Sequence, residues 1–222
     1  MLTKTDKLFA LIFSFLLITE LICGSVENLS TWHYITKPSL LISLLFYFYS
    51  QSKGLGSKTR IMMLAALAFS LLGDILLMFD DQSAIYFMLG LVAFLLAHLV
   101  YCFVFLNYRN PKTNPLGIIL ILLGYALGFF YFLKDGLNDL LIPVIIYMMV
   151  ILMMVITSYL RHKKVPEKSF ILVFSGALLF AISDSILALN KFYSPIQFSA
   201  IYIMLTYGLA QYFIVLGVLK QR

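Results

Sequence analysis

Eight long apolar stretches take up most of the sequence. They are 17 to 24 residues long and occupy residues 8–24, 34–50, 60–79, 84–106, 115–133, 139–160, 168–190 and 196–219. A helix that rises 1.5 Å per residue needs about 20 such residues to cross a hydrocarbon core about 30 Å thick. The pattern therefore predicts eight transmembrane helices joined by short connections, with no separate domain outside the membrane.

The composition argues against a soluble globular domain. Hydrophobic residues make up 62% of the chain and charged residues only 12%, whereas soluble domains average about 25% charged residues. We expect an all-α, polytopic membrane protein that folds as a single transmembrane domain over residues 1–222. Cys23 and Cys102 both fall in apolar stretches, so no disulfide is expected.

The net charge is +6, and the lysines and arginines are divided unevenly between the two predicted sides of the membrane. Thirteen of the sixteen lysines and arginines lie at the two termini or in the connections at 51–60, 107–114 and 161–168, and three lie on the other side: Lys37, Lys134 and Lys191. Cytoplasmic connections carry such an excess. We expect both termini in the cytoplasm, in a bacterial-type cell membrane, and we interpret the basic excess as an orientation signal rather than a nucleic-acid site.

Two aspartates, Asp74 and Asp184, lie deep inside apolar stretches. A carboxylate at the centre of a bilayer costs about 2.5 to 3.5 kcal/mol on insertion scales, so such residues usually face the interior of a helix bundle and line a site. The alternative is a hydrogen bond that only holds helices together. Both aspartates follow the predicted cytoplasmic end of their helix by about 14 to 16 residues, or about 21 to 24 Å. This places them in the outer half of the membrane.

An internal repeat becomes visible when the aspartates are aligned. Gly73-Asp74 and Ser183-Asp184 lie 110 positions apart, and two further pairs keep nearly that offset, Pro38 with Pro143 and Tyr101 with Gln211. Because four helices separate the copies, the halves 1–110 and 111–222 would be parallel repeats. The repeat predicts that both aspartates face one central polar cavity.

Other polar residues recur at helical spacing. His98 and Tyr101 share one helix face with Phe94, while Tyr207 shares a face with Gln211 and Tyr147 with Pro143. Glu20 and Lys37 lie near the outer ends of their helices, where they can form an ion pair or contact a lipid phosphate. Alternatively, Lys37 only extends to the interface.

The sequence lacks the signatures of several enzyme classes. We predict that His33 and His162 lie in loops on opposite sides of the membrane, so with His98 they cannot form a three-histidine metal site, and we expect no metal and no other cofactor. Motifs of nucleophilic hydrolases, such as Gly-x-Ser-x-Gly and Ser-x-x-Lys, are also missing. Any chemistry would have to come from carboxylic acids, one histidine, tyrosines and water.

Several motifs together resemble one family. They are Lys37-Pro38, Ser70-Leu-Leu-Gly-Asp74-Ile-Leu-Leu, Phe94-Leu-Leu-Ala-His98-Leu-Val-Tyr101, Pro143 with Tyr147, Gly176-Ala-Leu-Leu-Phe-Ala-Ile-Ser-Asp184-Ser-Ile-Leu-Ala and Tyr207-Gly-Leu-Ala-Gln211. Their order and spacing resemble the YhhN family of integral-membrane lysoplasmalogenases. The resemblance implies an ether-bond hydrolase that cleaves the sn-1 vinyl ether of a lysophospholipid in the bilayer to a fatty aldehyde and glycerophospho-ethanolamine or glycerophospho-choline.

That reaction suits a pair of carboxyls. A vinyl ether is hydrolysed by protonation of its β-carbon and capture of the resulting cation by water, which requires a general acid and a base. Asp74 and Asp184 would share these roles, and the sequence leaves open which is the acid. The supporting or substrate-binding residues would be Glu20, Lys37, His98, Tyr101, Tyr147, Tyr207 and Gln211.

The main alternative is a proton-coupled transporter of a small molecule or lipid that uses the same acidic pair. A transporter would be expected to break helices near the middle of the membrane. The prolines Pro38, Pro143 and Pro195 instead lie near the predicted helix starts. The oligomeric state stays open at this stage.

Overall fold

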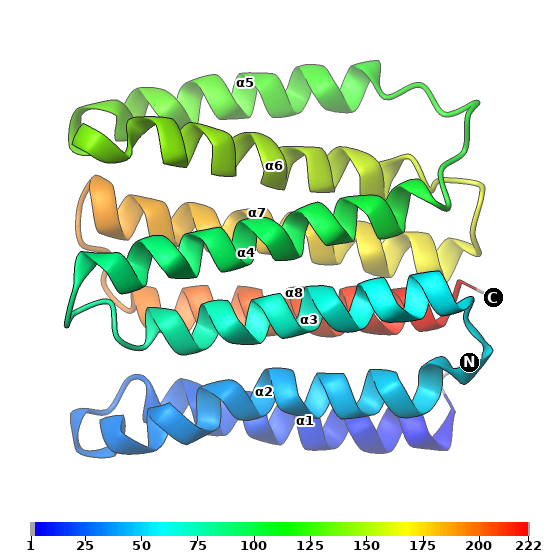
Figure 1. Cartoon of the computed structure of the whole chain (residues 1–222), viewed down its shortest axis with the longest axis horizontal. Coiled ribbons are helices and arrows are strands. Elements are labelled where there is room, and N and C mark those ends of the chain that lie inside the picture. Colours follow the sequence, from blue (N-terminus) through cyan, green and yellow to red (C-terminus); the bar gives the residue numbers. More distant parts are fainter. Residues whose placement is uncertain (1–2, 222) are drawn as a thin grey trace.

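The computed structural model describes residues 3–221, with Glu27 described by its backbone only. Within this range eight long helices follow one another and no strand forms. They lie side by side, and both ends of the chain are at the same end of the bundle (Figure 1). The helices are α1 Lys4–Cys23, α2 Ser30–Gln51, α3 Ser57–Leu77, α4 Ala84–Leu106, α5 Leu116–Leu133, α6 Leu141–Tyr159, α7 Glu167–Phe192 and α8 Ser199–Leu219.

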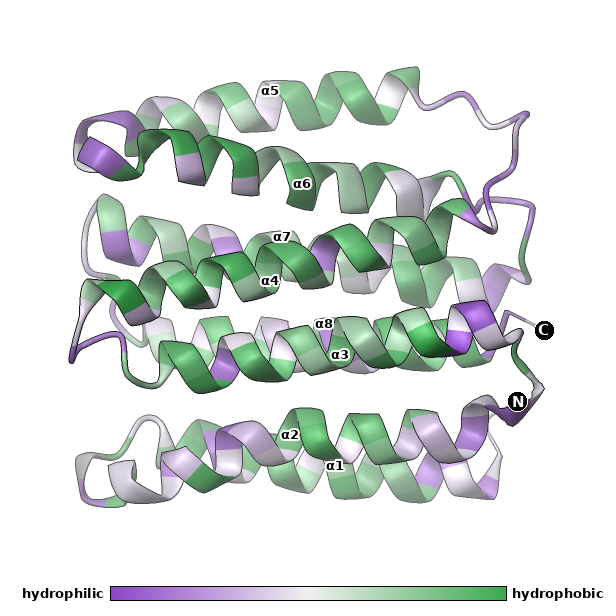
Figure 2. Cartoon of the chain, in the orientation of Figure 1, coloured by the Kyte–Doolittle hydropathy of each residue, from purple (hydrophilic) through white to green (hydrophobic). Residues whose placement is uncertain are grey.

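Six of these helices, α3 to α8, are long and apolar enough to cross a membrane. Their surfaces carry many large exposed hydrophobic side chains, which suits contact with lipid. Figure 2 shows α1 and α2 as less hydrophobic than the others, because polar residues such as Glu20 and Lys37 interrupt them. The chain is an integral membrane protein, while the count of eight spans stays a prediction.

Close helix contacts depend on glycines. A Cβ placed on Gly73 of α3 would lie 2.6 Å from the Phe94 ring of α4, and one placed on Gly176 of α7 would lie 2.9 Å from the Ala210 carbonyl oxygen of α8. The pairs α3–α4 and α7–α8 therefore pack as tight antiparallel hairpins. In addition, α2 contacts α8 and α4 contacts α6. A two-fold relation between the halves would produce such a pattern, but the repeat itself stays a prediction.

The start of α2 differs from the prediction. Residues 30–33, three of which are polar, were expected in a loop, but they form the first turn of α2, so the loop placement of His33 was wrong. The turn is stabilised by contacts of His33 and Thr36 with Glu20 on α1. Pro38 consequently lies inside α2 rather than near its start, and the helix continues through it although proline lacks a backbone donor.

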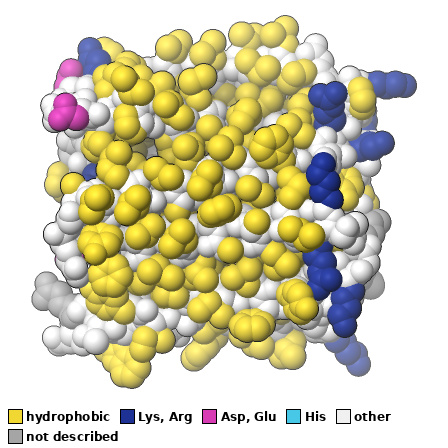
Figure 3. Space-filling model, viewed as in Figure 1, with side chains coloured by type: hydrophobic (Ala, Val, Ile, Leu, Met, Phe, Trp, Pro, Cys, Tyr) yellow, Lys and Arg dark blue, Asp and Glu magenta, His cyan; other side chains and the backbone are white. Residues whose placement is uncertain are grey.

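Basic side chains gather at the end of the bundle where the chain termini lie (Figure 3). At this end the Lys220 ammonium donates a hydrogen bond to the Asp6 carboxylate, and the Tyr47 hydroxyl donates another at 2.7 Å. The buried Arg161 guanidinium donates hydrogen bonds to Ser169 at 3.0 Å and to Gln221 at 2.9 Å. These contacts join the first and last helices and the α6–α7 connection.

Candidate active site

A cavity of about 900 Å³, here called the polar chamber, lies between α1, α2, α3, α4, α7 and α8. Both Asp74 and Asp184 line it, together with Glu20, Lys37 and Tyr207. Helices from both halves of the chain thus bring five of the predicted site residues to one cavity.

Asp74 is 2% exposed and anchors a line of hydrogen bonds. The Tyr207 hydroxyl donates to Asp74 Oδ2 at 2.7 Å, and Gln211 Nε2 donates to the same hydroxyl at 3.5 Å. Tyr101 in turn donates to Gln211 Oε1 at 2.7 Å. Tyr207 and Gln211 are one turn apart on α8, so this helix connects the aspartate on α3 with the tyrosine on α4.

Asp184 has a tyrosine partner of its own from α6. The Tyr147 hydroxyl donates to Asp184 Oδ2 at 2.5 Å. The preceding residue, Ser183, donates to the Ile203 carbonyl oxygen of α8 at 2.9 Å, and this bond fixes the position of α7 against α8. Unlike Asp74, Asp184 is only partly buried.

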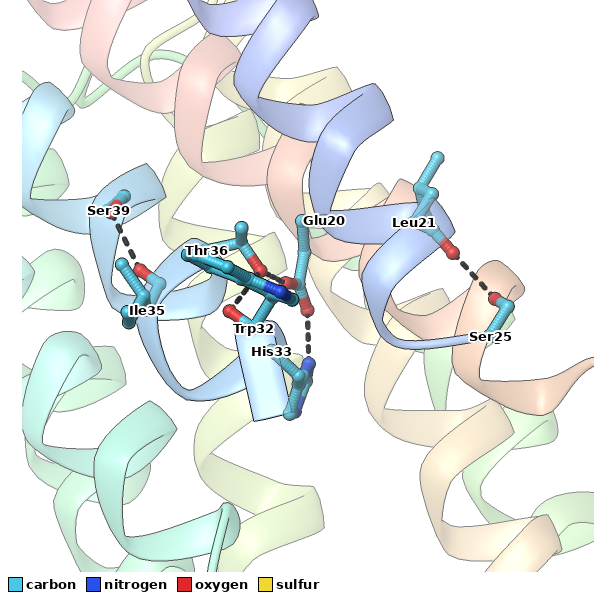
Figure 4. A network of polar contacts seen from close by, with 8 residues as sticks. All are labelled: Glu20, Leu21, Ser25, Trp32, His33, Ile35, Thr36 and Ser39. Carbon is cyan, nitrogen blue, oxygen red and sulfur yellow. Dashed lines mark hydrogen bonds and ion pairs between the residues drawn. The ribbon is translucent and has the colours of Figure 1, made fainter. Parts of the chain in front are cut away.

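Glu20 is buried, lines the polar chamber and belongs to a network of polar contacts (Figure 4). Its carboxylate accepts a hydrogen bond from the Thr36 hydroxyl, and His33 Nδ1 lies 2.8 Å from Glu20 Oε1. Its partner is thus His33 rather than Lys37, so of the alternatives considered for these two residues the ion pair does not form. Since His33 takes that position, Lys37 is left to line the chamber, which Asp74 also lines.

His33 is a chamber residue that the sequence interpretation missed. It lies one helical turn before Lys37, at the i, i+4 spacing that brings two side chains to one face. That spacing would have identified it if the helix had been predicted to begin at Ser30. Together His33 and Lys37 give the chamber two groups that can carry positive charge.

His98 does not line the polar chamber. It is fully buried, and neither ring nitrogen has a hydrogen-bond partner. Its ring packs against Phe180 with centroids 4.5 Å apart and against Tyr147 at 5.5 Å. In this structure His98 therefore supports the tyrosine that holds Asp184 and has no direct access to the chamber.

A second cavity, here called the apolar chamber, adjoins the first. It lies between α4, α5, α6 and α7. Three residues line both chambers: Phe87, Asp184 and Leu187. Asp184 is the only residue with a formal charge in the lining of the apolar chamber.

This arrangement is suited to acid–base chemistry. Two carboxyl groups line one cavity, and each accepts a hydrogen bond from a tyrosine that fixes its orientation. Among the described residues no three His, Cys, Asp or Glu side chains are grouped to hold a metal ion. The two carboxyl groups can donate protons to, and accept protons from, a bound molecule and water.

Comparisons with known proteins agree with the motif pattern. The sequence model of the YhhN family matches residues 32–218. Human lysoplasmalogenase TMEM86A is 32% identical over 168 residues, 75% of this chain and 68% of the relative, and the Bos taurus protein of that name is 33% identical with the same coverage. Lysoplasmalogenase TMEM86B of Sus scrofa is 29% identical over 80% of this chain and 71% of the relative. No solved structure matches. With its family model matched over most of its length, the chain belongs to the YhhN family.

Proposed function

We propose that this protein hydrolyses the sn-1 vinyl ether of lysoplasmalogens, with Asp74 and Asp184 as the reacting groups. Family membership and the similarity to proteins named lysoplasmalogenases support the reaction. The observation that carries the proposal is that both aspartates line one cavity, each hydrogen-bonded to a tyrosine. The products are a fatty aldehyde and glycerophospho-ethanolamine or glycerophospho-choline.

The chemistry of the bond explains why carboxyls suffice. A vinyl ether has no carbonyl for a nucleophile to attack, so the reaction starts with a proton added to the β-carbon. The resulting oxocarbenium ion is stabilised by a nearby carboxylate and captured by water, as in glycoside hydrolysis. Collapse of the hemiacetal then releases the aldehyde and the glycerol hydroxyl.

The rest of the polar chamber suits a zwitterionic head group. Lys37 and His33 offer positive charge to the phosphate, and Glu20 and Asp80 line the same cavity with the opposite sign. Asp80 also pairs with Lys191 at 2.9 Å, which joins the ends of α3 and α7 beside the cavity. The phosphate is assigned to Lys37, whose ammonium is not held in a salt bridge with a described residue.

The proposed orientation places the basic end of the bundle in the cytoplasm. Cytoplasmic ends of membrane proteins carry the excess of lysine and arginine that this end shows in Figure 3. Asp74 lies in the last turn of α3, towards the opposite end. The polar chamber would then serve the outer leaflet, at the depth where the vinyl ether lies just beneath the head group.

The test is hydrolysis by the purified protein of a 1-alkenyl lysophospholipid in D₂O. The expected products are one equivalent each of aldehyde and glycerophospholipid head, with one deuterium at C2 of the aldehyde because the proton is added to the β-carbon. The saturated 1-alkyl lysolipid serves as the control and should remain intact. If no aldehyde forms, or if the double variant Asp74→Asn/Asp184→Asn forms it at the wild-type rate, the proposal is wrong.

A further inference from the structure

The two chambers differ in chemistry and meet at one reactive group. On the polar side lie Glu20, His33, Lys37 and Asp74. On the apolar side the lining comes from aliphatic and aromatic residues such as Leu91, Phe129, Met148 and Ala188. Asp184 belongs to both linings, together with the hydrophobic Phe87 and Leu187.

A single-chain ether lipid has the same division. Its hydrocarbon chain is apolar throughout, its glycerol and phosphate are polar, and the vinyl ether lies where the two parts join. Burial of each methylene group in an apolar cavity contributes about 0.8 kcal/mol, whereas a phosphate is stabilised by cations. The apolar chamber therefore favours the chain, and the polar chamber favours the head.

We propose that the lysolipid lies with its alkenyl chain in the apolar chamber and its glycerophospho head in the polar chamber, so that Asp184 donates the proton and Asp74 activates water. This rests on the function proposed above. In this position the β-carbon, which belongs to the hydrocarbon chain, faces the apolar chamber. Asp184 carries the only carboxyl group in the lining of that chamber. Asp74 lies on the other side, with the head group and Lys37.

The proton balance closes over one turnover. Asp184 loses its proton to the β-carbon as the C=C electron pair forms the new C–H bond, and the α-carbon becomes an oxocarbenium ion. Water forms a bond to that carbon and gives its proton to the Asp74 carboxylate. In the collapse, Asp184 accepts the hemiacetal hydroxyl proton as the bond to the glycerol oxygen breaks, and Asp74 protonates that oxygen. Both aspartates return to their initial states.

The chain has a short route from the bilayer into the apolar chamber. Tyr125 of α5 lines the chamber, is 41% exposed and is hydrogen-bonded to Ser185 of α7. Only Leu122, Ala126 and Leu133 of α5 are buried, so this helix lies at the edge of the bundle (Figure 1). A lipid chain can therefore enter past α5 without crossing the polar chamber.

The experiment uses a probe that the enzyme cannot cleave. The probe is a 1-O-alkyl lysophosphatidylethanolamine, with a saturated ether and a diazirine at the end of its chain, which is photolysed on the purified full-length protein. Specific labelling is the part that an excess of unlabelled lysolipid removes, and it is located by peptide mass spectrometry. We expect it on the parts of α5, α6 and α7 that surround Phe129, Met148 and Ala188.

Two variants narrow the apolar chamber, and one matched variant leaves it open. Ala188→Trp and Val144→Phe should reduce specific labelling at least about tenfold, since displacing two or three methylene groups from the chamber is sufficient. Leu11→Trp adds bulk on the exposed face of α1, where Leu11 is 71% exposed and lines neither chamber, and should leave labelling unchanged. Size-exclusion profiles identify any variant that does not fold, and the other narrowing variant then provides the test.

The outcomes separate this proposal from the function on which it rests. Labelling confined to α1 and α2, or labelling that neither narrowing variant reduces, would overturn the position of the chain. Labelling in the apolar chamber of a protein that releases no aldehyde would overturn the hydrolysis and leave the chain site standing.

Discussion

At the scale of single residues, the central feature is that two similar aspartates have different surroundings. Asp74 is buried on the polar side, with Tyr207 as its hydrogen-bond donor and Lys37 in the lining of the same chamber. Asp184 is partly open, accepts a hydrogen bond from Tyr147 and also faces hydrocarbon side chains. A chamber that contains a cation suits a group that works as a carboxylate, and a chamber lined by hydrocarbon suits one that carries a proton.

This division predicts different responses to azide. In Asp74→Asn the oxocarbenium ion still forms, and azide can bond to its carbon in place of activated water, so added azide should trap it as the α-azido ether and raise consumption of the lysolipid by about tenfold or more. In Asp184→Asn the cation does not form, and azide should have no effect. The measurement is the rate of lysolipid consumption with and without azide, with the azido ether identified by mass spectrometry. Recovery of Asp184→Asn alone would reverse the roles.

Several residue positions could be predicted from the sequence because their pattern is local. The spacing of Tyr207 and Gln211 on one face, and the depth of both aspartates, follow from helical periodicity and hydropathy alone. The contact partners of these residues could not be predicted in the same way. The contacts of Tyr147 with Asp184 and of His33 with Glu20 depend on how separate helices pack. His98 illustrates the limit, since its polar type suggested a site residue while packing placed it among aromatic rings.

At the scale of helices, close packing of α7 on α8 positions Asp184 relative to Tyr207. Gly176 makes this approach possible, because a Cβ there would meet the backbone oxygen of Ala210 at 2.9 Å. A backbone atom in a helix cannot move away as the end of a flexible side chain can. The two helices would have to separate, and overpacking of this kind typically costs about 1 to 3 kcal/mol.

Gly176→Ala should therefore lower the thermal unfolding midpoint of the protein in detergent micelles. Gly124→Ala is the matched control, since a Cβ at Gly124 of α5 meets nothing within 4 Å. It should leave the midpoint unchanged or raise it, because alanine is favoured over glycine in a helix interior by about 0.5 to 1 kcal/mol. An unchanged midpoint in Gly176→Ala would show that the α7–α8 contact tolerates a methyl group.

The positions of the helices could be predicted well from the sequence, but the start of α2 could not. Predicted and observed bounds agree closely for α4 and α5, whose apolar stretches begin and end sharply. The first turn of α2 was missed because three of its residues are polar, and its stability comes from Glu20 on another helix. Hydropathy detects contact with lipid and does not detect a polar contact between helices.

At the scale of the whole molecule, the two ends of the chain are joined at the basic end of the bundle. Asp6 precedes the first apolar stretch and is bonded to Lys220 near the last residue of the chain. Burial alone would raise the pKa of Asp6, but hydrogen bonds from Lys220 and Tyr47 outweigh it and lower the pKa from 3.8 to about 2. The contact thus stabilises the folded protein whenever Asp6 is ionised.

The effect of pH on this contact has a definite sign. Because the folded pKa of Asp6 lies below its ordinary value, its stabilisation is complete above about pH 4 and is lost as the pH falls through about 2. Asp6→Asn should therefore be less stable than wild type at pH 7, by about 1 to 2 kcal/mol since Lys220 is partly exposed. The difference in unfolding midpoint should shrink between pH 4 and pH 2. A difference independent of pH would rule out the ionised contact.

The joint assignment of Asp74 and Asp184 as the reacting groups is tested most directly by the turnover rate of each single asparagine variant on a 1-alkenyl lysophospholipid. Asparagine keeps the size of the side chain but neither donates nor accepts the catalytic proton. We predict that each variant folds, still captures the uncleavable lysolipid probe, and loses about 10² to 10⁴ of the turnover rate. A folded Asp74→Asn or Asp184→Asn protein with turnover within about twofold of wild type would contradict the assignment.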